Sequence, residues 1–334
     1  MTRSSGTEQA LRGVRVLDFS RILAGPFCTM MLGDLGAEII KVERPGSGDD
    51  TRTWGPPFAG GESAYYLCCN RNKKSIAVDL GKPQGRELAT ELAKKSDVLI
   101  ENFTPGLMKR FGLDYETLRD LNPGLIYCSI TAYGQDGPYR DRPGYDMVLS
   151  AAGGLMWITG EREGNPCKVG VAITDVLTGV YASGAITAAL LWREKSGQGQ
   201  YIDCSLLDIQ ASGLANIASN YLVAGVEATR WGTAHESIVP YQVFPTRDRP
   251  IAIAVANQKL WEVFCEVTGK GEWRDDPRFA SNPKRVENRE TLVPLVAEVM
   301  ASRSCDEWME VLVEAAVPCG PVNNMESLFN DPQV

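Results

Sequence analysis

The sequence has very little histidine: His235 stands alone among 334 residues. A single imidazole excludes an H-E-x-x-H zinc motif, and it gives a Ser-His-Asp triad weak support because no G-x-S-x-G turn accompanies it. The 9 cysteines contain no C-x-x-C pair, and we find no secretion signal. We therefore expect reduced thiols in an intracellular protein and no metal site.

Long apolar runs and nucleotide-binding motifs are also missing. No stretch approaches the roughly 20 apolar residues that a membrane span needs, so we expect no membrane segment. The turn Ser20–Pro26 lacks the G-x-G-x-x-G motif, and Gly46 and Gly48 have no third glycine in register. Since there is no P-loop either, hydride transfer and nucleotide hydrolysis are disfavoured.

An excess of positive charge is absent as well. The chain has 34 Lys and Arg against 42 Asp and Glu, a net charge of -8, which offers no electrostatic footprint for nucleic acid or an anionic membrane. Any anionic ligand must then be held by local basic groups. The candidates are Arg44, Arg52, Arg110 and the cluster Arg71–Lys74. For the cluster alone, a solvated charged surface is the favoured interpretation.

What the chain does contain is a β-α-β pattern near its start. Val14–Phe19 is typical of a short buried strand, and Pro26 suits the first position of a helix that ends at Gly36. Glu38–Glu43 follows as a second strand. This order predicts two parallel strands joined by a right-handed crossover.

The same alternation continues along the chain. The further elements that we expect are a strand at Ser75–Leu80, a helix at Gln84–Lys95, a strand at Asp97–Glu101, a helix at Leu107–Arg119 and a strand at Leu125–Thr131. The alternation predicts an α/β fold with an open, doubly wound parallel sheet, Rossmann-like in type. Ligands bind beyond the carboxyl ends of such strands, here at Arg21–Gly25, Arg44–Gly48, Asn102–Gly106 and Ala132–Gly137.

From about Gly225 the pattern changes to that of a smaller α+β domain. Tyr241–Phe244 and Ile251–Ala256 read as a hairpin, and helices are expected at Lys259–Thr268, Thr291–Ala301 and Asp306–Ala315. The predicted limits are 10–224 for a large domain and 225–324 for a small one. Residues 325–334 are expected to begin a C-terminal return segment, with a helix starting near Asp331 and the remainder cut short.

Asp175 is the most informative single residue. The apolar run that ends at Thr174 continues as a helical pattern until Ser196–Gly199, so Asp175 is expected in the first turn of a helix. The positive end of the helix is expected to keep its carboxylate ionised, as a nucleophile requires. A capping or ordinary first-turn aspartate is the alternative, and it is the commoner one.

Segments spread in register from Leu11 to Val334 follow one known pattern. They are Leu11–Phe19, Leu23–Pro26, Leu32–Glu43, Asn70–Ser75, Glu101–Phe103, Tyr133–Pro138, Thr174–Asp175, Gly197–Gln200 and Pro318–Val322. Together they resemble the class III CoA-transferases of the formyl-CoA transferase type. Within that family, Val42–Phe58, Arg230–His235 and Ser237–Gln242 resemble the members that move CoA from succinyl-CoA to glutarate or another dicarboxylate.

The resemblance implies that Asp175 is the catalytic nucleophile, which forms an aspartyl anhydride and then an aspartyl-CoA thioester. It also implies acyl-CoA and small carboxylic acids as substrates, no permanently bound cofactor, and two chains threaded into an interlocked homodimer. The CoA contacts that it implies are Leu23, Ala24, Arg44, Val78, Asp79, Leu80, Gly81, Asn102, Phe103, Thr104, Arg110, Arg142, Pro143, Gly144 and Tyr145.

Two alternatives remain open at this stage. The α-methylacyl-CoA racemases share the family fold and carry a histidine at the position that matches Tyr145, where this chain has none. A CoA-binding protein without catalysis is the other. The expected compartment is the mitochondrial matrix if the source is eukaryotic and the cytoplasm if it is bacterial.

Overall fold

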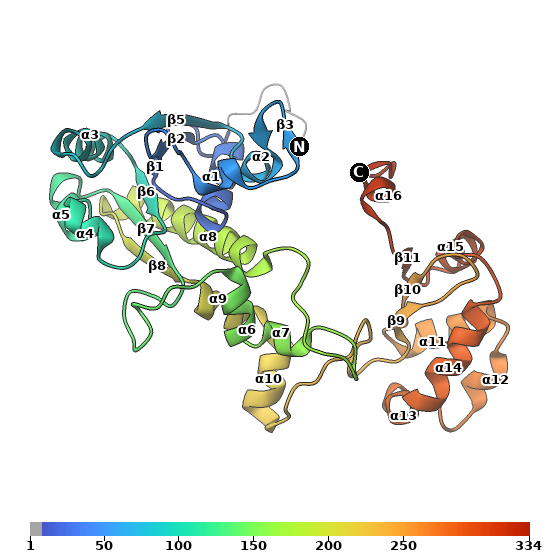
Figure 1. Ribbon diagram of the computed structural model, residues 1–334. Helices are drawn as coiled ribbons and strands as arrows, with labels where there is room; N and C mark the ends of the chain where they lie inside the picture. Colours follow the sequence, from blue (N-terminus) through green and yellow to red (C-terminus); the bar gives the residue numbers. More distant parts are fainter. Residues whose placement is uncertain (1–8) are drawn as a thin grey trace. The chain divides into compact units, whose positions relative to one another are not determined.

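The computed structural model describes residues 9–334, which form two compact units. The first unit runs to Ile158 and continues as Cys167–Ala228, and the second comprises Thr159–Pro166 and Thr229–Val334 (Figure 1). The sequence placed residues 159–166 in the large domain, whereas the structure packs them with the second unit.

The first unit is built on a six-stranded parallel sheet with the order β5-β2-β1-β6-β7-β8. The strands are β1 (Arg15–Asp18), β2 (Glu38–Glu43), β5 (Lys73–Ala77), β6 (Val98–Glu101), β7 (Ile126–Thr131) and β8 (Tyr201–Ser205). Since β1 lies between β2 and β6, the winding direction reverses there, and the loops after β1 and β6 meet at the crevice typical of ligand binding in such sheets. The doubly wound α/β prediction is confirmed.

Alternating residues of the central strands supply two apolar cores. Val16 packs into a core with Cys28 and Ile186, while Leu17 packs into another with Leu99. The helices α1 (Ala24–Asp34) and α8 (Ile173–Ser196) supply the first core, and the second lies with α3 (Pro83–Lys94), α4 (Leu107–Phe111) and α5 (Tyr115–Leu121). Burial on both faces explains why apolar residues follow one another directly in these strands, as in Val16–Leu17 and Val98–Ile100.

Helix α8 differs from the expectation that no stretch of the chain is long and apolar enough for a membrane span. It is long and apolar enough to cross a membrane, with a mean hydropathy of 1.3 over its most apolar window. Its buried residues, among them Ala182, Ile186 and Leu190, belong to the core of the first unit, and it packs against α1. Core packing therefore accounts for the buried apolar residues of α8, whereas Val180, Tyr181, Leu191 and Trp192 of the same helix are exposed.

The first unit has further small elements around the sheet. They are the 3-10 helix η1 (Asp50–Thr53), the hairpin strands β3 (Phe58–Ala59) and β4 (Glu62–Ser63), and the helices α2 (Ala64–Cys69), α6 (Asp146–Ala152), α7 (Leu155–Ile158), α9 (Leu206–Gly213) and α10 (Ala215–Ala224). η1 and α2 follow the carboxyl end of β2 in the chain, and α6 packs against α8.

The second unit contains a three-stranded antiparallel sheet in the order β11-β10-β9. Its strands are β9 (Tyr241–Phe244), β10 (Ile251–Ala254) and β11 (Cys319–Pro321), which confirms the predicted hairpin. Trp261, Phe264 and Trp308 are fully buried in its core. Its helices are α11 (Gln258–Val267), α12 (Gly271–Asp275), α13 (Asn282–Glu287), α14 (Arg289–Met300), α15 (Cys305–Glu314) and α16 (Met325–Phe329).

Some predicted element limits are wrong. Pro26 is the third residue of α1 rather than the first, and the strand expected at Ser75–Leu80 is β5, Lys73–Ala77. The helix expected over Leu107–Arg119 breaks into α4 and α5 because Gly112 adopts a left-handed φ of 69° that ends the first helix. The chain beyond Asp331 forms a turn and does not begin a helix.

Candidate active site

Two neighbouring cavities open at the carboxyl edge of the parallel sheet. The first, of about 270 Å³, is lined by residues after β1, β2 and β5, and the second, of about 250 Å³, by residues after β1, β6 and β7. Arg21 and Phe103 line both cavities. The pair of cavities therefore occupies the place where the winding of the sheet predicts a ligand.

The structure brings together nearly all the residues that the resemblance implied as CoA contacts. Arg44, Val78, Asp79, Leu80 and Gly81 line the first cavity. The second is lined by Leu23, Ala24, Asn102, Phe103, Thr104, Arg142, Pro143, Gly144, Tyr145 and Asp175. Arg110 lines neither cavity, although Leu107 and Phe111 of the same helix line the first. What these residues bind stays a prediction.

Asp175 lies in the first turn of α8, as expected, but it does not cap that helix. The N-cap residue is Ala172, which has no capping side chain. Instead Asp146, in the first turn of α6, accepts hydrogen bonds at Oδ2 from the backbone N–H of Thr174 (2.9 Å) and of Asp175 (3.3 Å). The capping role that the sequence offered to Asp175 is thus filled by a carboxylate 29 residues earlier.

The sequence led us to expect that the helix end stabilises the ionised form of Asp175, whereas the surroundings of Asp175 in the structure favour its neutral form. Burial raises the pKa of Asp175, and the neighbouring negative charge of Asp146 raises it further, to about 7. Asp146 also occupies the two amide groups through which the helix end would stabilise the Asp175 charge. A carboxyl group with this pKa is partly ionised at neutral pH and more basic than an ordinary aspartate.

The side chain of Thr174 anchors the start of α8. Its side chain is fully buried and contacts Ser150 Oγ at 3.0 Å, and it donates to Gln210 Oε1. Since Ser150 belongs to α6 and Gln210 to α9, two helices fix the start of α8, which carries Asp175. Such anchoring lowers the cost of holding a reactive side chain in one place.

Asn102, which lines the second cavity, also links two loops. Its side chain accepts from the backbone N–H of Arg21 (2.9 Å) and donates to the backbone oxygen of the same residue (2.7 Å). The amide therefore joins the loop after β6 to the loop after β1 where both line the second cavity. This double hydrogen bond makes Asn102 a structural link between the two loops.

Sequence reasoning missed functional candidates that lie beside the predicted ones. Asp146 follows Tyr145 directly, and Glu101, buried at the end of β6, accepts from the Phe103 N–H at 2.8 Å. Burial raises the pKa of Glu101 to about 7. A charged residue at the end of an apolar strand was the available signal for Glu101, whereas nothing local marked Asp146 as the partner of α8.

Other chemistries find little support around these cavities. None of the described residues that line either cavity is a histidine, and His235 belongs to the second unit. Across residues 9–334, no group of three or more His, Cys, Asp or Glu side chains is arranged to hold a metal ion. The 9 cysteines are free thiols.

The chain is similar to known CoA-transferases. The family model for CoA-transferase family III matches residues 11–334. The human succinyl-CoA:glutarate CoA-transferase (Homo sapiens) is 51% identical over 97% of this chain and 74% of its own length. A succinate–glutarate CoA-transferase of Agrobacterium fabrum is 45% identical over 100% of this chain and 85% of its own length.

A solved structure has the same fold. The crystal structure of a CAIB/BAIF family protein from Brucella suis superposes with a TM-score of 0.88 at 45% identity, and the match covers 98% of this chain and 87% of that one. The narrower likeness to the glutarate-using members, carried in the sequence by Val42–Phe58 and Arg230–Gln242, is supported by the named relatives.

Proposed function

The chain belongs to CoA-transferase family III and is a CoA-transferase, and we propose that it moves CoA from succinyl-CoA to glutarate or another dicarboxylate through a covalent intermediate on Asp175. The observation that carries the proposal is the position of Asp175. Among the described residues that line the second cavity it is the one carboxylate, and it lies at the anchored start of α8.

In the proposed reaction the Asp175 carboxylate attacks the thioester carbonyl of succinyl-CoA and expels CoA as a thiolate, which leaves a mixed anhydride. The thiolate then attacks the Asp175 carbonyl of that anhydride, forming an aspartyl-CoA thioester and releasing succinate. The acceptor carboxylate attacks this thioester, and the same steps in reverse yield the new acyl-CoA and free Asp175. Covalent catalysis of this kind divides one difficult exchange into easier steps.

The pKa of Asp175 suits this role. A carboxylate whose pKa is raised to about 7 is a better nucleophile once ionised than one of ordinary basicity. Each tetrahedral intermediate needs hydrogen-bond donors for its oxyanion. Because the N–H groups of Thr174 and Asp175 already donate to Asp146, the backbone around Gly144, which lines the same cavity, is the better candidate.

The charges around the cavities support CoA as the ligand. Arg44 lines the first cavity, Arg140 and Arg142 line the second, and Arg21 lines both. Guanidinium groups bind phosphate and carboxylate in paired hydrogen bonds, so these side chains suit the phosphates of CoA and the second carboxylate of a dicarboxylate acceptor. The segment Arg230–Gln242, which resembles the dicarboxylate-using members of the family, lies in the second unit.

The assembly and the compartment are part of the proposal. Family likeness favours an interlocked homodimer, and exposed apolar side chains on α10, including Leu222 and Val223, are consistent with a surface that another chain covers. We propose an intracellular location, in the mitochondrial matrix for a eukaryotic source and in the cytoplasm for a bacterial one.

The test of the chemistry is covalent labelling. The protein is incubated with succinyl-CoA, quenched and digested, and the peptide that contains Asp175 is expected to gain the mass of CoA or of the acyl group. Asp175→Asn should lower acyl exchange by about 1,000-fold or more, since the nucleophile is lost. Asp208→Asn, which alters another first-turn aspartate, in α9, is the matched control and should retain activity. Full turnover by Asp175→Asn would refute the assignment.

Competing functions give different results in related assays. A panel of free acids offered with succinyl-CoA, with the products identified by mass, shows which acceptor is used. Incorporation of solvent deuterium at the α-carbon of a branched acyl-CoA would instead indicate a racemase. Affinity for CoA without any acyl exchange would indicate a binding protein.

A further inference from the structure

The loop Arg21–Ala24, which lines the second cavity, contains an unusual backbone conformation. Ile22 has a φ of 72°, in the left-handed region that residues with a branched Cβ rarely adopt. Arg21 lines both cavities, and Ile22, Leu23 and Ala24 line the one that contains Asp175. Conformations of this kind persist only where the surroundings impose them, and they concentrate at functional sites.

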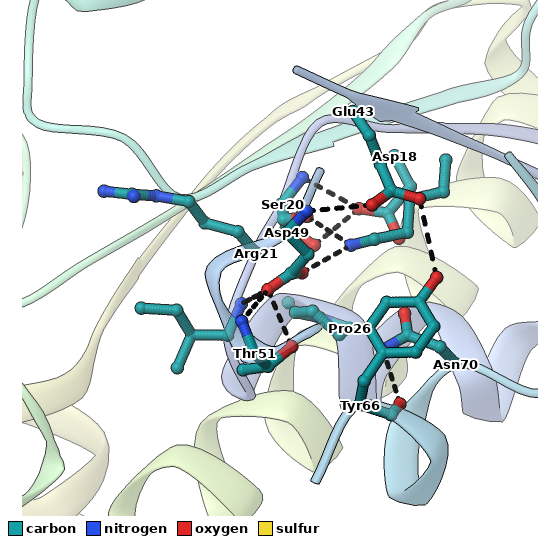
Figure 2. A network of polar contacts seen from close by, with 12 residues as sticks. Asp18, Ser20, Arg21, Pro26, Glu43, Asp49, Thr51, Tyr66 and Asn70 are labelled. Atoms are coloured by element: carbon teal, nitrogen blue, oxygen red, sulfur yellow. Dashed lines mark hydrogen bonds and ion pairs between the residues drawn. The ribbon is translucent and has the colours of Figure 1, made fainter. Parts of the chain in front are cut away.

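Asp49 is the residue that holds Ile22 in place. The Ile22 N–H lies 3.3 Å from both oxygens of the Asp49 carboxylate. The same carboxylate accepts from Thr51 through its N–H (3.0 Å) and its Oγ1 (2.7 Å), and it forms an ion pair with Lys41 Nζ at 2.9 Å. Figure 2 shows dashed lines converging on Asp49 beside Thr51 and the Arg21 segment.

Lys41 ties the same loop from the other side. Its ammonium group also donates to the backbone oxygen of Ser20 at 2.8 Å, and the Lys41 and Asp49 side chains are 1% and 0% exposed. Burial lowers the pKa of Lys41, but the charges of Asp18 and Asp49 outweigh that effect and raise it, so Lys41 stays charged. Together with the Asn102 hydrogen bonds to Arg21, this ties three consecutive residues, Ser20, Arg21 and Ile22.

The ion pair sits within a larger buried network. Lys73 Nζ contacts Asp18 Oδ2 at 3.4 Å, and Arg52 donates to both oxygens of Glu43 at 2.8 Å. Buried ion pairs are poor stabilisers, because the cost of removing two charges from water offsets their attraction. A network of ion pairs beside a loop that lines the cavities is better explained by the geometry that the network imposes than by the stability that it adds.

We propose that Asp49, fixed by Lys41, is a positioning residue for acyl-CoA binding: it holds Ile22 in its left-handed conformation and so gives the loop Arg21–Ala24 the shape that lines the two cavities. This inference rests on the proposed function, because it takes an acyl-CoA thioester as the ligand of those cavities. Asp49 itself lines only the first cavity, and it acts on the second through the backbone of Ile22.

The first test is Asp49→Asn. The described groups that contact the Asp49 carboxylate, namely Lys41 Nζ, the Ile22 N–H and both donors of Thr51, are all hydrogen-bond donors, so an amide NH₂ would face donors with no acceptor to receive it. We expect the dissociation constant for CoA, measured by calorimetry without turnover, to rise by about 10-fold to 100-fold as the loop loses its shape. The KM for succinyl-CoA should rise in parallel.

The matched control is Lys73→Met. It removes an equally buried ammonium group from the same network, since the Lys73 and Asp18 side chains are 2% and 0% exposed, and this group pairs with Asp18, the Pro26 oxygen and Asn70 rather than with Asp49. Its melting temperature should fall while its affinity for CoA changes by less than about threefold. Equal losses of affinity in Asp49→Asn and Lys73→Met would overturn the proposal, because they would show a general effect of stability.

Ile22→Gly provides a second, independent test of the proposal. Glycine adopts a positive φ without strain, so the loop can keep its shape when the hydrogen bonds to residue 49 are weakened. Adding Ile22→Gly to Asp49→Asn should restore CoA affinity by about threefold or more relative to Asp49→Asn alone. If Asp49→Asn does not fold, Thr51→Val, which removes one donor to Asp49, replaces it in the same comparison, with a smaller rise in the dissociation constant expected.

The outcomes also separate this inference from the proposed function. If the unaltered protein does not bind CoA, the proposed function fails and the inference fails with it. If the unaltered protein binds CoA and Asp49→Asn binds it equally well, the inference alone fails. Loss of exchange in Asp175→Asn with CoA affinity retained would leave both standing.

Discussion

Two carboxylates, those of Asp146 and Asp175, lie at the start of α8. Asp146 accepts hydrogen bonds from the first-turn N–H groups of Thr174 and Asp175, while the Asp175 carboxyl group lines the cavity without that support. Its charge is therefore stabilised less than the helix end would allow, and it is opposed by the charge of Asp146. At the scale of single residues, burial and then the charge of a neighbour distant in sequence raise the pKa of Asp175.

Asp146→Asn tests whether the charge of Asp146 raises the pKa of Asp175. The amide oxygen can still accept from the N–H groups of α8, but the negative charge is gone, so the pKa of Asp175 should fall from its value of about 7. Since the ionised carboxylate attacks, kcat/KM should rise with pH through the pKa of free Asp175, and in the variant that rise should occur at lower pH. The measurement is the pH profile of succinyl-CoA exchange between pH 5 and 9.

The control for this profile is Asp208→Asn, which removes a charge from the first turn of α9 and should leave the midpoint unchanged. A midpoint for Asp146→Asn that stays in place or moves to higher pH would show that Asp146 does not set the pKa of Asp175.

At the scale of elements, the site depends on how closely α1 and α8 approach. Gly179 of α8 lies against the start of α1: a Cβ there would be 2.7 Å from the backbone oxygen of Ala24 and 3.1 Å from Phe27 Cβ. Ala24 lines the cavity that Asp175 faces. The absent side chain at residue 179 therefore sets the distance between two walls of the site.

Gly179→Ala should separate the two helices and lower the free energy of unfolding by about 1–3 kcal/mol, the usual cost of overpacking. Because the start of α1 must shift, the KM for succinyl-CoA should rise as well. Urea denaturation and steady-state kinetics provide the two measurements.

Gly184→Ala is the matched control in the same helix. A Cβ at residue 184 has nothing within 4 Å in the described chain, so alanine should raise the free energy of unfolding by about 0.5–1 kcal/mol through helix propensity. If both substitutions have the same effect, close packing at Gly179 is not what matters.

At the scale of the whole molecule, the exposed apolar surface remains to be explained. Leu222 is 80% exposed and Val223 is 83% exposed, both on α10. We expect these side chains to be covered by a second chain, so sedimentation should give about twice the 36.5 kDa of one chain. The double variant Leu222→Ser and Val223→Ser should shift the mass toward that of one chain.

Leu88→Ser serves as the control for this experiment, since Leu88 is a 43% exposed leucine on α3. It should leave the measured mass unchanged. A single-chain mass for the unaltered protein would contradict the proposed homodimer.

Local patterns in the sequence determined the elements and much of the site. The strands β6 and β7 are buried along their whole length and β1 and β2 over most of theirs, so each appears as an apolar segment, and their alternation with helices led to a parallel sheet. The likeness to class III CoA-transferases was visible in the same way, since its motifs are short and contiguous. The pattern placed Asp175 at the start of a helix, whereas its role and the CoA-contact residues were implied by the resemblance.

Only the tertiary structure decided how those elements act on one another. The cap from Asp146 to Asp175 spans 29 residues, the Asn102 link to Arg21 spans 81, and the contact of Asp49 with Ile22 spans 27. No periodicity or propensity encodes such pairs, because both describe neighbours along the chain. The basicity of Asp175 and the shape of the Arg21–Ala24 loop result from burial and from charges that folding brings together, and these exist only once the chain has folded.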